Sequence, residues 1–165
     1  MIILHIETST NICSIAISEN GQCIFTKSDS EGMNHAALLS VFIAEAMEFL
    51  KSVSKNPDAV AVSSGPGSYT GLRIGVSTAK GLCYGLDIPL IAVSTLEILT
   101  ANALLTAEAG TNTLFCPMID ARRMEVYAAF YNQEGIIQRE ISADIIDENS
   151  YSEILENHSV YFFGN

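Results

Sequence analysis

The stretch from Ser63 to Gly85 constrains this chain more than any other part of its sequence. It reads Ser-Ser-Gly-Pro-Gly-Ser-Tyr-Thr-Gly-Leu-Arg-Ile-Gly-Val-Ser-Thr-Ala-Lys-Gly-Leu-Cys-Tyr-Gly and follows a short apolar run at 59–62. The glycines and the proline at 65–67 predict a sharp turn between a strand and a helix. Thr70 is expected to cap that helix, because its hydroxyl can accept a hydrogen bond from a first-turn N–H group.

Three glycines, Gly71, Gly75 and Gly81, lie inside the predicted helix. Each is expected to destabilise the helix by about 1 kcal/mol relative to alanine. A loss of this size needs a compensating contact, and the close approach of another backbone is the usual one. We therefore expect this helix to pack closely against a neighbouring segment.

Apolar runs and turn signals predict the other elements in two series. The first series has strands over 2–6, 12–18, 22–26, 59–62 and 89–93, with helices over 35–53, after the glycine turn, and over 94–105. Asn20-Gly21 is typical of a two-residue hairpin turn, and Ser94 with Glu97 forms a predicted capping box. The second series has strands over 114–119, 124–131, 136–142 and 160–163, with a helix over 151–156.

Both series follow the order strand, strand, strand, helix, strand. This α/β order resembles the actin-like superfamily, in which two lobes each resemble ribonuclease H. We therefore expect a first lobe over 1–105, a linker over 106–113 and a second lobe over 114–165. In this alignment of the two halves, Glu7-Thr8 corresponds to Asp120-Ala121. The second series stops after its fourth strand, so the second lobe is expected to be incomplete.

Charge and composition restrict the functions open to the chain. The net charge is −11, and the acidic excess is present in both halves. With no basic stripe, direct tight binding to a phosphate backbone is not expected. The N-terminus lacks the basic start of a signal peptide, and the apolar run at 36–50 is too short to span a bilayer. Four cysteines without a Cys-x-x-Cys pair predict reduced thiols in a cytoplasmic protein.

The glycine turn fits none of the common catalytic or nucleotide-binding motifs. It lacks the spacing of a Walker A loop, and Thr70 stands where the dinucleotide fingerprint needs its third glycine. There is no Gly-x-Ser-x-Gly nucleophile elbow. The three histidines, His5, His35 and His158, are isolated in the sequence, so a metal site built from them is not expected.

Two acidic residues at predicted strand ends could form a different kind of site, one that binds a metal ion. Glu7 and Asp120 could face one another between the lobes and hold Mg²⁺ through water, as paired carboxylates do in nucleotide sites of this fold class. They could equally be strand-end residues that accept hydrogen bonds from local N–H groups.

The two helices of the first lobe carry apolar or small residues outside their predicted core stripes. On the 35–53 helix the core stripe comprises Leu39, Phe42, Ile43, Ala46 and Leu50; on the glycine helix it comprises Leu72, Val76, Ala79, Cys83 and Leu86. The remaining face of each helix has two interpretations. In one, it belongs to a wide core on the 35–53 helix and to an ordinary exposed surface on the glycine helix. In the other, it is an interface with a partner. The candidate interface residues are Leu38, Val41, Glu45, Phe49, Arg73, Ile74, Ser77, Thr78, Gly81 and Gly85. Small side chains favour the second interpretation, because they let another helix come close.

The glycine stretch also resembles a known family. Gly-Pro-Gly-Ser-Tyr-Thr-Gly-Leu-Arg-Ile-Gly is similar to the signature of the TsaB family, companion subunits of the bacterial machinery that makes threonylcarbamoyladenosine in tRNA. Three further segments agree: Glu7-Thr8-Ser9, Ser94-Thr95-Leu96-Glu97, and Asp120 to Tyr127. The resemblance extends from residue 1 to about residue 131. Family members usually continue beyond the point where this chain stops, so it is expected to be a fragment or a member with a short second lobe.

The resemblance implies a non-catalytic scaffold subunit of the tRNA threonylcarbamoyl transferase complex. In the family, the first two helices dock on the equivalent helices of the catalytic TsaD subunit, and the same face can form a homodimer. There Arg73 is expected to pair with an acidic group of the partner. The TsaD subunit holds metal and nucleotide, and a TsaE ATPase subunit engages the pair. This chain alone is then expected to bind no cofactor and to meet tRNA only within the complex.

Two alternatives remain open from the sequence. The chain could be an independent actin-like ATPase or kinase that uses Glu7 and Asp120, or a dinucleotide-binding enzyme that uses the Gly65–Gly71 turn.

Overall fold

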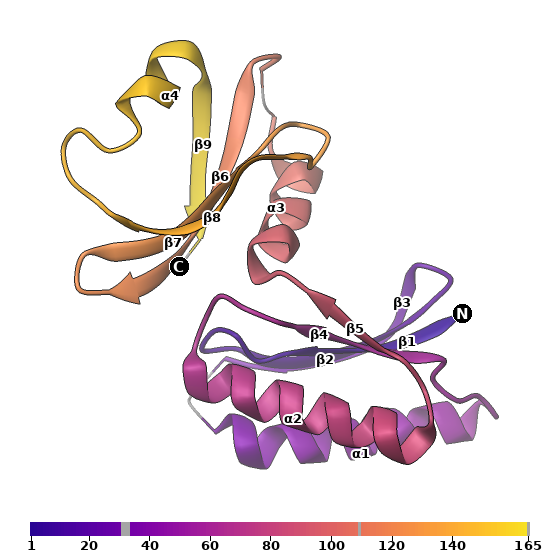
Figure 1. Cartoon of the computed structure of the whole chain (residues 1–165). Helices are drawn as coiled ribbons and strands as arrows, with labels where there is room; N and C mark the ends of the chain where they lie inside the picture. Colours follow the sequence, from indigo (N-terminus) through magenta and orange to yellow (C-terminus); the bar gives the residue numbers. More distant parts are fainter. Residues whose placement is uncertain (31–33, 109, 165) are drawn as a thin grey trace. The chain divides into compact units, whose positions relative to one another are not determined.

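The computed structural model describes residues 1–30, 34–108 and 110–164 of the chain. It consists of two compact units, Met1–Val93 and Ser94–Asn165, and each is described by itself (Figure 1). The sequence predicted the boundary at 106–113. The structure instead groups the helix that begins at Thr95 with the second unit, because that helix packs on the second sheet.

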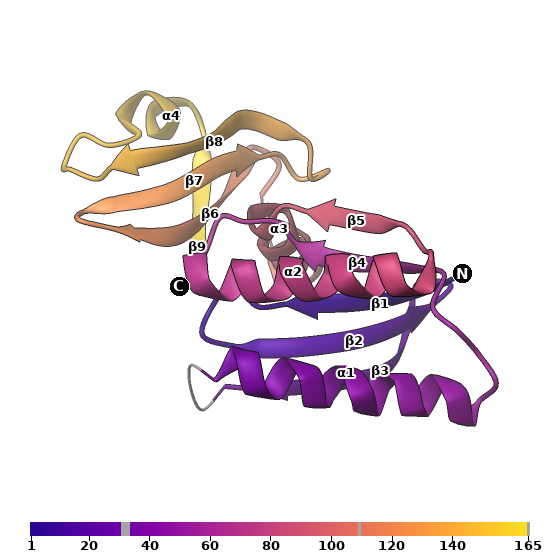
Figure 2. The same ribbon diagram turned by 60° about the horizontal axis from the view of Figure 1, so that its bottom comes forward.

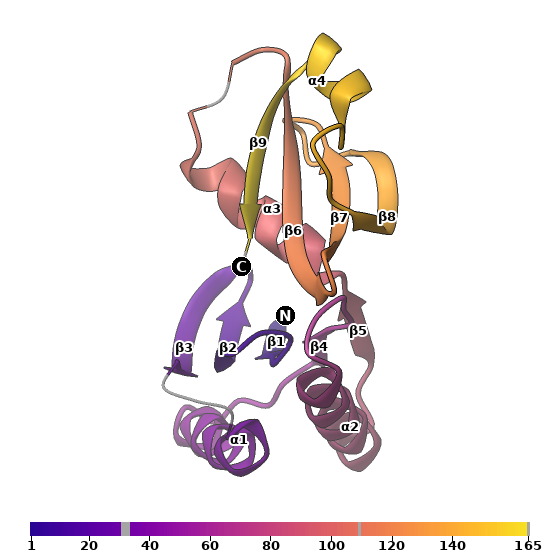
Figure 3. The ribbon, with the colours of Figure 1, turned by 90° about the vertical axis from the view of Figure 1, so that its left-hand side faces the viewer.

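The first unit is a five-stranded sheet with two helices on one face. The strands are β1 (Ile2–Glu7), β2 (Cys13–Glu19), β3 (Gln22–Asp29), β4 (Ala59–Ser63) and β5 (Leu90–Val93), in the order β3-β2-β1-β4-β5. β1, β2 and β3 pair antiparallel, whereas β4 and β5 join in parallel. The helices α1 (His35–Ser52) and α2 (Tyr69–Leu86) lie side by side under this sheet (Figures 2 and 3).

Alternation along β1 and β2 explains why one face of the first sheet is buried. Every second residue from Ile2 to Ile6 and from Cys13 to Ile17 is buried. The predicted stripe of α1 packs against them: Leu39, Ile43, Ala46 and Leu50 are buried and Phe42 is partly buried. The predicted core face of α1 is therefore confirmed.

The second unit is a four-stranded sheet with a helix on each face. Its elements are α3 (Thr95–Thr106), β6 (Thr113–Arg122), β7 (Glu125–Tyr131), β8 (Ile137–Ile145), α4 (Ser152–Asn157) and β9 (Ser159–Gly164). One core cluster joins Leu96 and Ala103 of α3 to Phe115 and Ile119 of β6. On the other face, Phe130 belongs to a cluster that includes residues of α4.

The two sheets repeat one strand order. The second sheet has the order β8-β7-β6-β9, which matches β3-β2-β1-β4 of the first. In each, two antiparallel pairings are followed by one parallel pairing. The predicted duplication of a ribonuclease-H-like order is therefore confirmed.

Two predicted helix caps differ from the structure. Ser68, not Thr70, is the N-cap of α2, and its hydroxyl accepts a hydrogen bond from the N–H of Gly71 at 3.2 Å. Ser94 is the N-cap of α3, but its side chain makes no capping hydrogen bond. In the described part of the chain, no helix is long and apolar enough to cross a membrane.

A polar cluster fastens the segment between β8 and α4 to the second sheet. Asp144 accepts hydrogen bonds from the guanidinium of Arg139 and from the hydroxyls of Tyr151 and Ser142, the last two at 2.7 Å. The guanidinium also lies 5.0 Å from the ring centroid of Phe130 and 5.2 Å from that of Tyr151. Burial alone would raise the pKa of Asp144, but the hydrogen bonds from Arg139, Tyr151 and Ser142 outweigh it and lower that pKa.

The cluster predicts a pH-dependent contribution to stability. Asp144→Asn should lower the free energy of unfolding at pH 7 by about 2 kcal/mol, because the charge-assisted bond to Arg139 is lost. A lowered pKa in the folded chain means that ionised Asp144 stabilises it above about pH 4, and that this stabilisation is lost as the pH falls through the folded pKa. Urea titrations followed by circular dichroism should therefore show a mutant difference that shrinks below about pH 4. Glu148→Gln, at an exposed carboxylate nearby, is the control and should show no such trend.

Candidate functional site

The loop between β1 and β2 lies directly against the N-terminal end of α2. Thr8 and Ser9 are fully buried. The Thr8 hydroxyl donates to the carbonyl oxygen of Gly71 at 2.8 Å, and the backbone N–H of Ser68 donates to the carbonyl oxygen of Ser9 at 2.6 Å. These two bonds fix the glycine turn and the first turn of α2 to the first strand.

The close contact explains why this helix begins with glycines. A Cβ on Gly71 would overlap the carbonyl oxygen of Thr8, and one on Gly75 would overlap the Thr8 hydroxyl. Gly67 is equally close to the carbonyl oxygen of Ser9. The close approach predicted for Gly71 and Gly75 is therefore confirmed. No other segment of the chain approaches Gly81 in this way, since a Cβ there would meet nothing within 4 Å.

The same contact uses two of the N–H groups that could otherwise hold an anion. Free N–H groups at a helix N-terminus are the usual binding site for phosphate. In α2 the N–H of Ser68 is bonded to Ser9 and the N–H of Gly71 to the Ser68 hydroxyl. The turn is thus built for packing of the chain on itself.

The two candidate cleft carboxylates are both engaged locally. Glu7 accepts hydrogen bonds from the N–H of Ser9 at 2.6 Å and from the hydroxyl of Ser63 at 3.0 Å. Asp120 accepts one from the N–H of Arg122 at 2.7 Å. Within the described ranges, no group of three or more His, Cys, Asp or Glu residues could hold a metal ion. These bonds support the structural interpretation of both carboxylates.

A groove separates the N-terminal halves of α1 and α2. Its volume is about 460 Å³, and its lining comprises Ala36 of α1 and Thr70, Arg73, Ile74, Ser77 and Thr78 of α2. Four of the ten predicted interface residues therefore meet in one place. The guanidinium of Arg73 lies 5.4 Å from the ring centroid of Tyr69, and this cation–π contact keeps the guanidinium beside that ring. Ile74 is partly buried and also packs on the core of the first unit.

The predicted residues of α1 lie on a different flank of that helix. Glu45 forms an ion pair with Lys27 of β3 at 2.7 Å, and the Phe49 ring lies 5.2 Å from that of Phe25. Leu38 and Phe49 are partly buried against the core. This flank faces β3, so the core interpretation applies to Leu38 and Phe49. Val41 is 51% exposed.

The flank of α1 that lines the groove carries small residues. Ala36 is in the groove, and Ser40 and Ala44 follow at a spacing of four residues, which places them on the same side of the helix. All three are exposed. The sequence prediction did not include these residues, although a repeat of short side chains every four residues indicates such a flank.

The outer face of the C-terminal half of α2 is open to solvent. Nothing lies within 4 Å of a Cβ built on Gly81 or Gly85. Tyr84, which the sequence did not single out, is 93% exposed. Leu86 is 41% exposed, so its predicted place in the core stripe is wrong. It is the last residue of the helix, where the chain turns toward β5.

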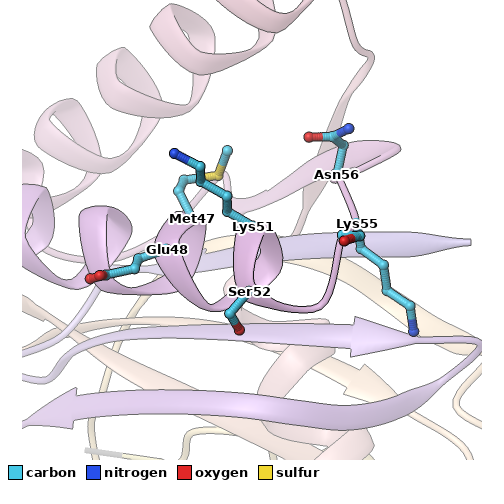
Figure 4. Close-up of a pocket in the computed structure, with 7 residues that line it drawn as sticks. Met47, Glu48, Lys51, Ser52, Lys55 and Asn56 are labelled. Carbon is cyan, nitrogen blue, oxygen red and sulfur yellow. The ribbon is translucent and has the colours of Figure 1, made fainter.

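A second hollow lies at the C-terminal end of α1 (Figure 4). Its lining residues are Met47, Glu48, Lys51, Ser52, Ser54, Lys55 and Asn56. Lys55 forms a bidentate ion pair with Glu19 at 2.6 and 2.7 Å. Figure 4 shows Met47 and Lys51 projecting from one side of the helix, as their spacing of four residues requires. Charged, polar and apolar side chains from the end of α1 and the segment after it line the hollow. This mixture indicates no particular ligand.

Comparison with known proteins assigns the chain to a family. The model of the TsaD family, described as tRNA N6-adenosine threonylcarbamoyltransferase, matches residues 30–156. The tRNA threonylcarbamoyladenosine biosynthesis protein TsaB of Bacillus subtilis is 33% identical over 144 residues, 87% of this chain and 61% of that protein. TsaB of Buchnera aphidicola is 32% identical over 158 residues, 94% of this chain and 70% of that protein.

The chain belongs to the TsaB family. Among solved structures, YeaZ from Pseudomonas aeruginosa superimposes with a TM-score of 0.68 at 28% identity, covering 90% of this chain and 68% of that one. With the TsaD family match, this confirms the predicted actin-like α/β fold. The TsaB-family chain spans about 61% of the length of the Bacillus relative.

Two glycine substitutions within α2 test the contact with the β1–β2 loop. Gly71→Ala should lower the free energy of unfolding by about 3 kcal/mol, since the new methyl group must displace the Thr8 backbone. Gly81→Ala in the same helix should raise it by about 1 kcal/mol, because the site is open and alanine favours helix. Urea denaturation followed by circular dichroism measures both. Equal effects of the two substitutions would contradict the proposed role of the contact.

Proposed function

We propose that this chain is a non-catalytic subunit of the tRNA threonylcarbamoyl transferase complex. In this proposal its α1–α2 face binds a TsaD-type catalytic subunit, and the same face can pair two copies of the chain. ATP and metal are held by the TsaD-type subunit and by a TsaE-type ATPase subunit. The chain is located in the cytoplasm and contacts tRNA only as part of the complex. The names of its TsaB relatives, which place them in threonylcarbamoyladenosine biosynthesis, support this role.

The groove between α1 and α2 is the observation that carries the proposal. Short side chains line both of its sides: Ala36 on α1, and Thr70, Ser77 and Thr78 on α2. Neighbouring helices pack with axes 8–10 Å apart, and short side chains at the contact allow the lower end of this range. A partner that offers its own helix to such a groove can bury the side chain of Ile74 further and pair an acidic group with Arg73.

The local hydrogen bonds at the loops also support a scaffold role over the ATPase alternative. Glu7, Asp120 and the N–H groups of Ser68 and Gly71 are engaged within the chain. A nucleotide site would have to break these bonds first. Binding of Mg-ATP by the isolated chain would favour the alternative.

The first experiment is light scattering coupled to gel filtration, on the chain alone and mixed with a TsaD-family subunit. A one-to-one complex at micromolar concentration is the expected result. A folded chain that ignores the TsaD-family subunit would contradict the proposal and make nucleotide binding the next question.

The substitution Gly81→Leu tests where the partner binds. The added side chain should obstruct the partner and abolish the complex, because exposed Gly81 lies one helical turn beyond Ser77 and Thr78 on the same side of α2. The first unit should remain folded by circular dichroism, because the site is open to solvent. Gln22→Leu adds the same apolar group on the exposed β2–β3 hairpin and should leave the complex intact. A complex that survives Gly81→Leu would exclude this face.

A further inference from the structure

Three basic side chains of the first unit lie on its two helices without a carboxylate partner. Two of the five lysines and arginines in that unit form ion pairs within it, as Lys27 does with Glu45 at 2.7 Å. The other three are exposed and form no ion pair with a described residue: Lys51 of α1 and Arg73 and Lys80 of α2. We refer to the surface that carries these three residues as the cationic face.

Their spacing places the three cations beside the groove between α1 and α2. Lys51 follows Ala44 by seven residues, two helical turns, so it continues the flank of α1 that borders the groove. Arg73 lines the groove, and Lys80 follows it by seven residues on the same side of α2. Because the two helices run side by side (Figure 2), the three cations border one surface.

Carboxylates are scarce on the cationic face. The sequence from 59 to 86, which includes all of α2, contains no aspartate or glutamate. The two carboxylates of α1 are Glu45, which pairs with Lys27 on the flank toward β3, and Glu48, which is exposed. A chain with a net charge of −11 therefore presents a surface of the opposite sign on these helices.

Two exposed tyrosines lie on the same side of α2 as its cations. Tyr69, four residues before Arg73, is 76% exposed, and Tyr84, four residues after Lys80, is 93% exposed. Tyrosine and arginine are enriched where one protein binds another. Three cations are too few to hold nucleic acid tightly against the net charge of −11. The cationic face therefore fits a protein partner.

We propose that the cationic face selects an acidic helix of a partner protein over a second copy of this chain. Two copies paired through this face would bring cations together whether α2 meets α2 or α1, because α1 adds Lys51. Like charges in contact disfavour the wrong partner. A partner helix with aspartate or glutamate opposite Arg73 and Lys80 would instead form ion pairs. The identity of this partner as a TsaD-type subunit rests on the proposed function.

A charge-reversed copy of the chain serves as the acidic partner in the first test. Labelled wild-type chain is mixed with the double variant Arg73→Glu, Lys80→Glu and followed by sedimentation velocity. The mixed dimer should be tighter than the wild-type dimer by about tenfold or more. The double variant Arg122→Glu, Arg123→Glu has the same net charge, but it reverses exposed residues of the β6–β7 hairpin. Its mixture with wild type should be no tighter than the wild-type dimer.

Both double variants are then titrated with a TsaD-family subunit. Binding should weaken by about tenfold or more for Arg73→Glu, Lys80→Glu, because like charges then face the partner's acidic helix. Binding should be unchanged for Arg122→Glu, Arg123→Glu. All four substitutions are at exposed positions, and circular dichroism verifies that each variant is folded.

The outcomes separate this selection from the proposed function. A wild-type chain that binds itself as tightly as it binds the Arg73→Glu, Lys80→Glu variant overturns the selection. A TsaD-family subunit that binds that variant as tightly as wild type also overturns it, as do equal effects of the two double variants. A wild-type chain that binds no TsaD-family subunit contradicts the proposed function instead, and the mixture of the two copies still decides whether the cationic face prefers an acidic helix.

Discussion

The seating of the β1–β2 loop on the first turn of α2 is the contact on which the first unit depends. Thr8 and Ser9 are buried there, and two hydrogen bonds join their segment to Ser68 and Gly71. The loop approaches so closely that only glycine fits at the facing positions of the helix. Because this contact holds the N-terminal end of α2, it helps to place the helix along β4 and beside α1.

The two faces of α2 consequently have different roles. Gly71 and Gly75 lie on the inner face, where they receive the loop. Gly81 and Gly85 lie on the outer face, where a Cβ would meet nothing within 4 Å. Glycine in the middle of a helix weakens it in both cases, but only the inward pair is compensated by a contact within the chain. The cost at Gly81 and Gly85 is left without an internal reason, which is the physical basis for expecting an external partner.

Element order was predictable from the sequence because apolar periodicity and turn residues are local signals. The order of strands and helices along both units and the core stripe of α1 followed from them. The cap of α2 did not, since Ser68 and Thr70 are both suitable and tertiary contact with Ser9 decides between them. The groove flank of α1 did not either. Periodicity finds the buried stripe of a helix, but it does not tell which flank faces β3 and which faces α2.

The repeat also shows that shared topology does not give the two units shared chemistry. The hairpin between β6 and β7 corresponds to the β1–β2 loop, yet it is held through Asp120 and presents Arg122, Arg123 and Met124 to solvent. These three residues have φ values of 69°, 55° and 64°, a region that non-glycine residues rarely occupy. In the first unit the equivalent loop packs on α2 through Thr8 and Ser9, which are buried. The two loops therefore differ in what holds them: a neighbouring helix in the first unit, and a carboxylate of the hairpin itself in the second.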